Sequence, residues 1–386
     1  MQLVAYGAQD IYLTGNPQIT FFKVVYRRHT NFSMEAIEQT LSGQNNIGGT
    51  VTSTISRNGD LIHNMYVNAK FSQFGDEESG NPGTTLLKMV QLEIGGQRID
   101  RYYNDWLETW TELTQVNPGG LIASAPYDNT GSTLYQKMSG SGGVIGRAGG
   151  NTDQTDLMIP LPFWFCRNVG LALPLIALQY HEVKIDITLN ETGGFGGSTH
   201  VRLVDGGISL WVDYIYLDTD ERRRFAQVSH EYLIEQVQRI SSTDSSQIEL
   251  NFNHPVKELI WIGKPDSSEY GDATPVTISG DTVQYNLKLN GHDRFERRKT
   301  SYFTRCQVWK HHTGFGGTIK RDSIAVYSFA LKPEEHQPSG TCNFSRIDDA
   351  RLVRTGELEA SGLIIYAVNY NVLRIMSGMG GLAYSN

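Results

Sequence analysis

The 386-residue sequence is poor in cysteine and has no long apolar run. Its three cysteines, Cys166, Cys306 and Cys342, are far apart, and no CxxC pair or Cys/His metal spacing occurs. This pattern argues against a disulfide scaffold or zinc ribbon and is typical of free thiols in a reducing compartment. Nothing approaches 18 uninterrupted apolar residues, and the first residues lack the basic and apolar segments of a secretory signal. We therefore expect neither a transmembrane helix nor a signal peptide.

Basic residues are too few for a protein that wraps nucleic acid. Lys and Arg number 33 against 41 Asp and Glu, which gives a formal net charge of -8. Because duplex binding depends on cationic side chains that neutralise phosphates, we expect no direct, specific nucleic-acid binding. Glu221–Arg224 and Arg294–Lys299 are basic exceptions, and their context favours linker or ion-paired roles.

Catalytic motifs are also missing. Gly140–Gly146 differs from GxGxxG by one residue and has no βαβ context, and no GxSxG, HExxH or Walker loop occurs. His311 and His312 could bind a metal, but adjacent residues on a strand face opposite ways, so an ordinary loop pair is the better interpretation. We predict that the chain is not an enzyme, and we assign no catalytic, cofactor-binding or metal-binding residue.

Strand patterns dominate what is present. Hydrophobic residues make up 39% of the chain, which is enough to fill sizeable cores, and 40 glycines indicate many turns. Apolar and polar residues alternate with period two over residues 61–71, 183–190, 248–253 and 283–290. These segments are predicted to be strands with one face in a core, so the chain is predicted to be all-β.

Helical patterns are few and loops are long. Apolar residues at Tyr103, Trp106, Leu107 and Trp110 predict an amphipathic helix over Asp100–Leu113. Residues 219–226 are predicted to link two domains. The segment after them could form a short helix or a strand, and a strand is favoured. Residues 117–156 and 192–199 are predicted to be loop insertions.

The two halves share three short patterns in the same order. Asp60–Ile62 resembles Glu258–Ile260, Leu92–Gly96 resembles Leu287–Gly291, and Val212–Leu217 resembles Val368–Leu373. Each match alone is weak. Their common order favours a duplication of one all-β unit, which is typical of two packed sandwiches.

The segment 160–178 contains Pro160, Pro162 and Pro174, which exclude a regular helix or central strand. A hydrophobic pocket is one interpretation. Filling of the core and of a contact between chains, by Phe163, Trp164 and Phe165, is the favoured one.

Longer motifs run along the whole chain. They are Gly7–Asp10, Tyr12–Lys23, Tyr26–Arg28, Ser56–Ile62, Glu93–Gln97, Leu161–Phe165, Gly170–Leu175, Leu217–Arg222, Asn253–Leu259, Leu289–Gly291, Arg294–Phe295, Tyr327–Leu331, Gln337–Arg346, Tyr366–Ala367, Tyr370–Arg374 and Gly378–Tyr384. In these motifs the sequence resembles the major capsid proteins of nucleocytoplasmic large DNA viruses, such as chloroviruses, other phycodnaviruses and iridoviruses, and the resemblance covers the whole chain.

The resemblance implies a double jelly roll, in which two eight-stranded antiparallel β-sandwiches are fused and short helices lie in the loops. It implies a homotrimer that forms a pseudo-hexameric capsomer, and capsomers that tile the icosahedral shell of a large dsDNA virus assembled in the host cytoplasm. The implied partners are neighbouring capsomers, minor capsid and penton proteins, and an inner viral membrane near the N-terminal side.

On this basis we expect an N-terminal arm over residues 1–25, a first jelly roll over 26–218, a linker over 219–226 and a second jelly roll over 227–386. The arm has a local excess of Lys23, Arg27 and Arg28 over Asp10, which suits acidic partners or anionic lipid. The alternative function is a carbohydrate-binding β-sandwich module, and we expect no cofactor in either case.

Overall fold

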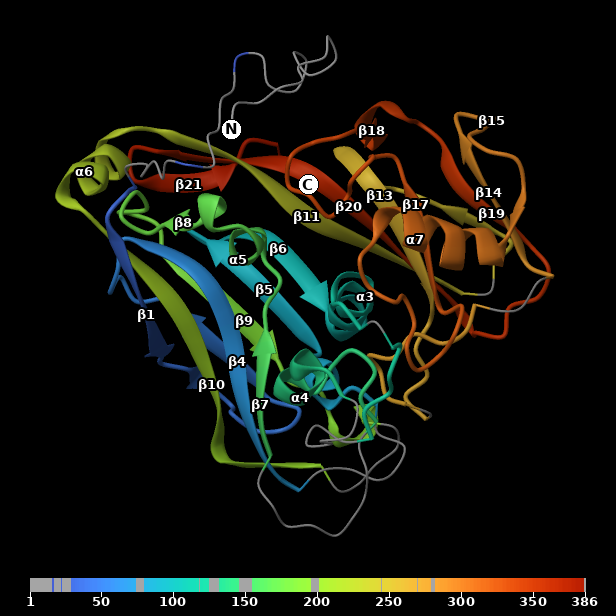
Figure 1. The fold of residues 1–386 in the computed structure, drawn as a ribbon, viewed down its shortest axis with the longest axis horizontal. Coiled ribbons are helices and arrows are strands. Elements are labelled where there is room, and N and C mark those ends of the chain that lie inside the picture. The colour runs from blue at the N-terminus through green and yellow to red at the C-terminus, as the bar shows by residue number, and fades with distance from the viewer. Residues whose placement is uncertain are drawn as a thin grey trace, which may run out of the picture.

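The structure is a computed structural model that describes residues 29–73, 80–117, 119–124, 132–145, 155–195, 201–243, 245–268, 270–278 and 282–384, with Asn16 and Phe22. Apart from those two positions, the predicted arm over residues 1–25 lies outside the described residues. Four antiparallel sheets pair into two sandwiches that lie side by side (Figure 1). No helix within the described ranges is long and apolar enough to cross a membrane.

The first sandwich pairs sheet I, of order β1-β10-β4-β7 with β8 on β4, and sheet II, of order β2-β3-β9-β5-β6. Its strands are β1 (Phe32–Gln39), β2 (Ser42–Gly43), β3 (Thr50–Thr54), β4 (Leu61–Gln73), β5 (Met89–Ile94), β6 (Gln97–Tyr103), β7 (Thr155–Pro160), β8 (Leu173–Pro174), β9 (Val183–Thr188) and β10 (Arg202–Leu217). Alternate residues of β4, such as Met65 and Val67, are buried in the core, as the period-two pattern predicts.

The second sandwich pairs sheet III, of order β11-β20-β13-β17 with β18 on β13 and β21 on β20, and sheet IV, of order β12-β19-β14-β15 with β16 on β14. Its strands are β11 (His230–Thr243), β12 (Gln247–Glu249), β13 (Pro255–Gly263), β14 (Gln284–Leu289), β15 (His292–Asp293), β16 (Arg298–Lys299), β17 (Ile324–Ser328), β18 (Cys342–Asn343), β19 (Ala350–Thr355), β20 (Gly362–Met376) and β21 (Met379–Leu382).

Both sandwiches have jelly-roll topology, which confirms the predicted fold class. Counting the main strands along each half, one sheet has the order first, eighth, third, sixth and the other has the order second, seventh, fourth, fifth. In the second half, the fifth position is shared by the two-residue strands β15 and β16, which both pair with β14.

The three sequence repeats fall on equivalent strands, namely β4 and β13, β5 and β14, and β10 and β20. The turns after β5 and β14 also match, because Gly95-Gly96 and Asn290-Gly291 all have positive φ, as a type I′ hairpin turn requires. The pairing registers differ, however. Ile62 lies opposite Tyr214, whereas Ile260 lies opposite Tyr366. The duplication therefore holds for whole strands and not residue by residue.

The helices are short and lie mainly between strands. They are α2 (Pro82–Leu86), α3 (Asn104–Thr114), α4 (Leu134–Ser139), α5 (Trp164–Arg167), α6 (Thr219–Gln227) and α7 (Val308–His311), with the single turns η1 (Val169–Leu171), η2 (Thr192–Gly194) and η4 (Phe344–Arg346) and the π-helix η3 (Tyr302–Gln307). The predicted helix over Asp100–Leu113 is wrong at its start. Residues 97–103 pair with β5 as strand β6, and this ladder uses the backbone groups that a helix would need.

The proline-containing segment after β7 confirms part of its interpretation. It forms α5, η1 and the two-residue strand β8, with no long regular element. Phe163, Trp164 and Phe165 are at most 2% exposed in the single chain. They fill the core as predicted, but their assignment to a contact between chains is wrong, because this chain already covers them.

Sheet III is buried on both faces. Along β20, Ile364, Tyr366 and Val368 join the core of the first sandwich, while Leu363, Ile365 and Ala367 join the separate core of the second. Successive side chains on a strand point to opposite faces, so β20 lies between two cores, and its sequence is accordingly an almost continuous apolar run. The core of the first sandwich thus extends onto one face of sheet III, and the core of the second sandwich lies on the other face.

Candidate functional site: the junction of the two sandwiches

Helix α3 lies between the first sandwich and strands β11 and β20 of sheet III (Figure 1). Every residue from Asn104 to Leu113 is buried, including the charged ones. Trp106 packs on Tyr366 of β20, with ring centroids 4.9 Å apart. Burial of a polar group without a partner costs about 1–3 kcal/mol, so each polar side chain of this helix needs a partner.

The second sandwich closes the C-terminal end of α3. The last carbonyl groups of a helix have no partner within the helix. Here the backbone N–H of Gly314 donates to the carbonyl of Leu113 at 2.7 Å, and that of Gly316 donates to Glu112 at 2.9 Å. A Cβ atom at Gly314 would lie 2.3 Å from the Glu112 carbonyl oxygen, so a larger residue would push the loop away.

Two carboxyl groups lie one helical turn apart on α3. Glu112 accepts hydrogen bonds from the backbone N–H and the hydroxyl of Thr318 in the second sandwich. Glu108 accepts from Thr84 at 2.8 Å and from the backbone N–H of Gly142 at 3.0 Å. Burial, and then the charge of Glu112, raise the pKa of Glu108 to about 8.

The N-terminal end of α3 is joined to sheet III by an ion pair. Arg239 of β11 donates to Asp105 at 2.7 Å and lies 4.8 Å above the ring of Tyr103. Beside it, the side chain of Gln236 donates to the carbonyl of Ile99 in β6. These contacts fix the register between β6 and β11, because each requires one defined pair of residues.

A buried cluster of charges surrounds Glu235 of β11. Arg167 of α5 donates to it at 2.6 Å, Lys257 of β13 lies at 2.8 Å, and the ring of His336 lies at 3.5 Å. Burial alone would raise the pKa of Glu235, but these three bases hold it at about 2. Arg167 belongs to the first sandwich, so its ion pair with Glu235 joins the two halves. Without Arg167, the buried carboxylate of Glu235 would lose one of the positive charges that stabilise it.

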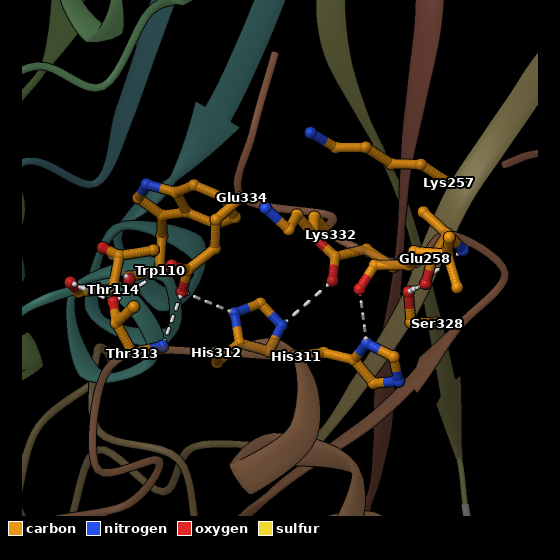
Figure 2. Close-up of polar contacts among 12 residues, drawn as sticks. Trp110, Thr114, Lys257, Glu258, His311, His312, Thr313, Ser328, Lys332 and Glu334 are labelled. Carbon is orange, nitrogen blue, oxygen red and sulfur yellow. Dashed lines mark hydrogen bonds and ion pairs between the residues drawn. The ribbon is translucent and has the colours of Figure 1, made fainter. Parts of the chain in front are cut away.

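His312 bridges two carboxylates at the end of α7 (Figure 2). Its Nε2 lies 3.0 Å from Glu258 and its Nδ1 lies 3.0 Å from Glu334. The neighbouring Thr313 donates its backbone N–H to Glu334 at 2.9 Å and its hydroxyl to the carbonyl of Thr114 in α3 at 3.1 Å. Burial alone would lower the pKa of His312, but the two carboxylates raise it to about 9. The cationic ring thus supports the loop that closes α3.

The predicted role of the histidine pair is corrected in part. His312 is fully buried between carboxylates, which a loop pair would not require. The ring of His311 lies instead 3.3 Å from the carbonyl of Leu331. The described residues hold no group of three or more His, Cys, Asp or Glu that could bind a metal.

Arg222 and Arg224 of the first arginine run are ion-paired, as the sequence favours, whereas Arg298 of the second packs on an aromatic ring. Arg222 of α6 lies 2.8 Å from Asp60, and Arg224 lies 3.5 Å from Glu221. Arg298 stacks on Tyr302, with its guanidinium carbon 4.3 Å from the ring centroid.

Most contacts of the junction have no visible signal in the sequence. Asp105, Glu108 and Glu112 lie on the face of the predicted helix that should meet water, and their partners are remote in sequence. Their one visible feature is that three acids share a helix with two tryptophans.

Replacement of His312 by Gln is predicted to flatten the pH dependence of stability. The rise in pKa from 6.5 to about 9 means that His312 stabilises the fold fully below about pH 6.5, and that this is lost as the pH rises through 9. It corresponds to about 3 kcal/mol. Urea unfolding at pH 6 and pH 9.5 should show that much less loss in the variant. His311→Gln is the matched control, and parallel curves for His312→Gln and the unmodified protein would refute the role.

Two family models cover most of the chain. One, described as "Major capsid protein N-terminus", matches residues 20–218, and one, described as "Large eukaryotic DNA virus major capsid protein", matches residues 221–381. The chain is 52% identical to a major capsid protein of Pyramimonas orientalis virus and 44% identical to one of Paramecium bursaria Chlorella virus 1, each alignment covering 100% of this chain and 99% of the relative.

Solved structures agree. The chain matches the PBCV-1 virus capsid with a TM-score of 0.76 at 39% identity, over 95% of this chain and 100% of that one. The Faustovirus major capsid protein matches with a TM-score of 0.66 at 14% identity, over 96% of this chain and 94% of that one, which supports the fold alone. These relatives are capsid proteins, so the carbohydrate-binding alternative gains no support. The chain therefore belongs to the family of the major capsid proteins of large eukaryotic DNA viruses, and it is a structural component of the virion capsid.

Proposed function

We propose that three copies of this chain form a ring-shaped capsomer of near-hexagonal outline, and that these capsomers tile an icosahedral shell. The observation that carries the proposal is the repetition of one jelly-roll topology within a single chain. Three such chains supply six similar sandwiches, and a cyclic trimer closes with every copy in the same environment. The buried junction supports it, because a tile must keep its two halves at a fixed angle.

The same proposal includes the division of the chain into an arm over residues 1–25, jelly rolls over 26–218 and 227–386, and a linker over 219–226. Strand β10 ends at Leu217 and β11 begins at His230, with α6 between them. The break between the two family matches, at 218 and 221, supports the same division.

Light scattering during size-exclusion chromatography tests the trimer. We expect a mass of about three times 43.1 kDa, and electron microscopy of that fraction should show ring-shaped particles of near-hexagonal outline. A protein that stays monomeric at high concentration and binds glycans would overturn the proposal in favour of a carbohydrate-binding module.

We also propose that the N-terminal side faces the inside of the virion, where minor capsid and penton proteins and the inner membrane would be its partners. The basic residues Lys23, Arg27 and Arg28 support this side, because acidic proteins and anionic lipid attract them. Deletion of residues 2–20 should leave trimers intact and abolish shell assembly. Normal particles from the deletion variant would contradict this role.

Finally, we propose that the protein acts without catalysis or sequence-specific nucleic-acid binding, and that assembly occurs in the host cytoplasm. The free thiols of Cys166, Cys306 and Cys342 support a reducing compartment. Immunolabelling of infected cells should find growing shells in the cytoplasm, and shells confined to another compartment would contradict the localisation.

A further inference from the structure

The outward face of sheet I is rich in large apolar side chains. It carries Met34 of β1, Tyr66 of β4, Met158 of β7 and Trp211 of β10. The strand neighbours of Tyr66, Met158 and Trp211 are core residues, so these three point away from the core. Met34 pairs with Ile215 of β10, which lies on the same side of that strand as Trp211, so Met34 points the same way. Tyr66 and Trp211 stack with a 3° angle between their rings, and Met34 and Met158 are 46% and 44% exposed. A sheet face that only met water would carry polar residues here.

The equivalent face in the second sandwich is already occupied. Sheet III has the same strand order as sheet I, and its outward face packs on the first sandwich, where Trp106 of α3 contacts Tyr366. Helix α3 lies between the fifth and sixth main strands of its sandwich. The second sandwich has a helical segment at the equivalent position, between its own fifth and sixth main strands, namely η3 followed by α7.

We propose that the outward face of sheet I receives helix α7 of a second copy of this chain, with Trp309 as the anchor. The inference rests on the proposed trimer and deepens it by naming the two surfaces that meet. The proposed contact between chains repeats a contact within the chain. There, the outward face of sheet III in the second jelly roll covers helix α3 of the first. Each copy then offers one α7 and one sheet I face, so three copies can close a ring.

Trp309 has the properties of an interface anchor. It is 80% exposed on α7, and Phe315 nearby in the chain is 48% exposed. Exposed tryptophan is unfavourable in a free surface, and buried tryptophans are the most frequent hot spots of protein interfaces. A groove of about 600 Å³ at the β7 edge of sheet I is lined by Tyr66, Trp110, Met138, Met158 and Pro160, and it is large enough for an indole ring.

Charge also matches the two surfaces. Glu38 of β1 and Asp213 of β10 lie on the sheet I face, whereas Lys310 is exposed beside Trp309 and Arg305 lies one turn earlier, paired with Asp322. Lys70, farther along β4, lies opposite Asp156 of β7.

The junction inside the chain has the opposite arrangement of charge. There the base, Arg239, is on the sheet and the acid, Asp105, is on the helix. The acidic sheet I face would therefore be repelled by the acids of α3 and attracted by the bases at and near α7. This difference directs sheet I to α7 and leaves α3 to sheet III.

Replacement of Trp309 by Ala tests the anchor. Sedimentation should show a monomer at concentrations at least 100-fold above those at which the unmodified protein is a trimer, with unchanged circular dichroism because the side chain is exposed. Tyr180→Ala is the matched control, since Tyr180 is 75% exposed but lies beside Gly378, next to the β20–β21 turn, and it should remain trimeric. A Trp309→Ala protein that trimerises normally would overturn the inference and leave the proposed function standing.

Charge reversal tests the pairing of the surfaces. Glu38→Lys and Lys310→Glu should each weaken the trimer at least tenfold, and the double variant should recover most of the loss. Additive losses, or no loss, would show that the two surfaces do not meet. An unmodified protein that never forms a trimer would instead overturn the proposed function itself.

Discussion

A helix that is buried on every side is the constraint on which this structure depends. Helix α3 carries three acids into the interior, and its C-terminal carbonyl groups have no partners of their own. The second sandwich supplies what is missing, through Arg239, the backbone of Gly314 and Gly316, and Thr318. Because isolated buried polar groups are costly, neither half of the junction is satisfied without the other. The two jelly rolls therefore form one body.

The same junction gives the repeated fold its asymmetry. Sheets I and III have the same topology, yet sheet III is buried on both faces, whereas the outward face of sheet I is covered only at the end that holds Leu61 and Ile215. The sequence reflects this difference. Strand β20 is buried over ten consecutive positions, of which Gly362–Val368 are all apolar, whereas β4 alternates. A chain with one covered and one uncovered equivalent face has a natural direction of further assembly, which is the property that a shell tile needs.

Prediction from sequence succeeded where the information is local. Period-two alternation found β4, β9 and β14, and the ordered repeats found the duplication at the level of strands. It failed at residues 100–103, where the pairing of β6 with β5 prevails over helical periodicity. It also missed the pairs that join the halves, such as Arg167 with Glu235 and His312 with Glu258, because nothing in a single sequence links residues so far apart. The role in the capsid was predicted from the long motifs that resemble the family, and not from these contacts.

Native-state hydrogen exchange, followed as a function of denaturant, tests most directly whether the two sandwiches are one body. If the junction unites them, the slowest amides of sheet II and sheet IV will exchange through one common opening, with the same free energy and the same denaturant dependence. Amides of α3 and β20 will belong to that opening as well. If sheet IV instead opens at a distinctly lower free energy while sheet II stays protected, the halves are independent domains and the account of the junction is wrong.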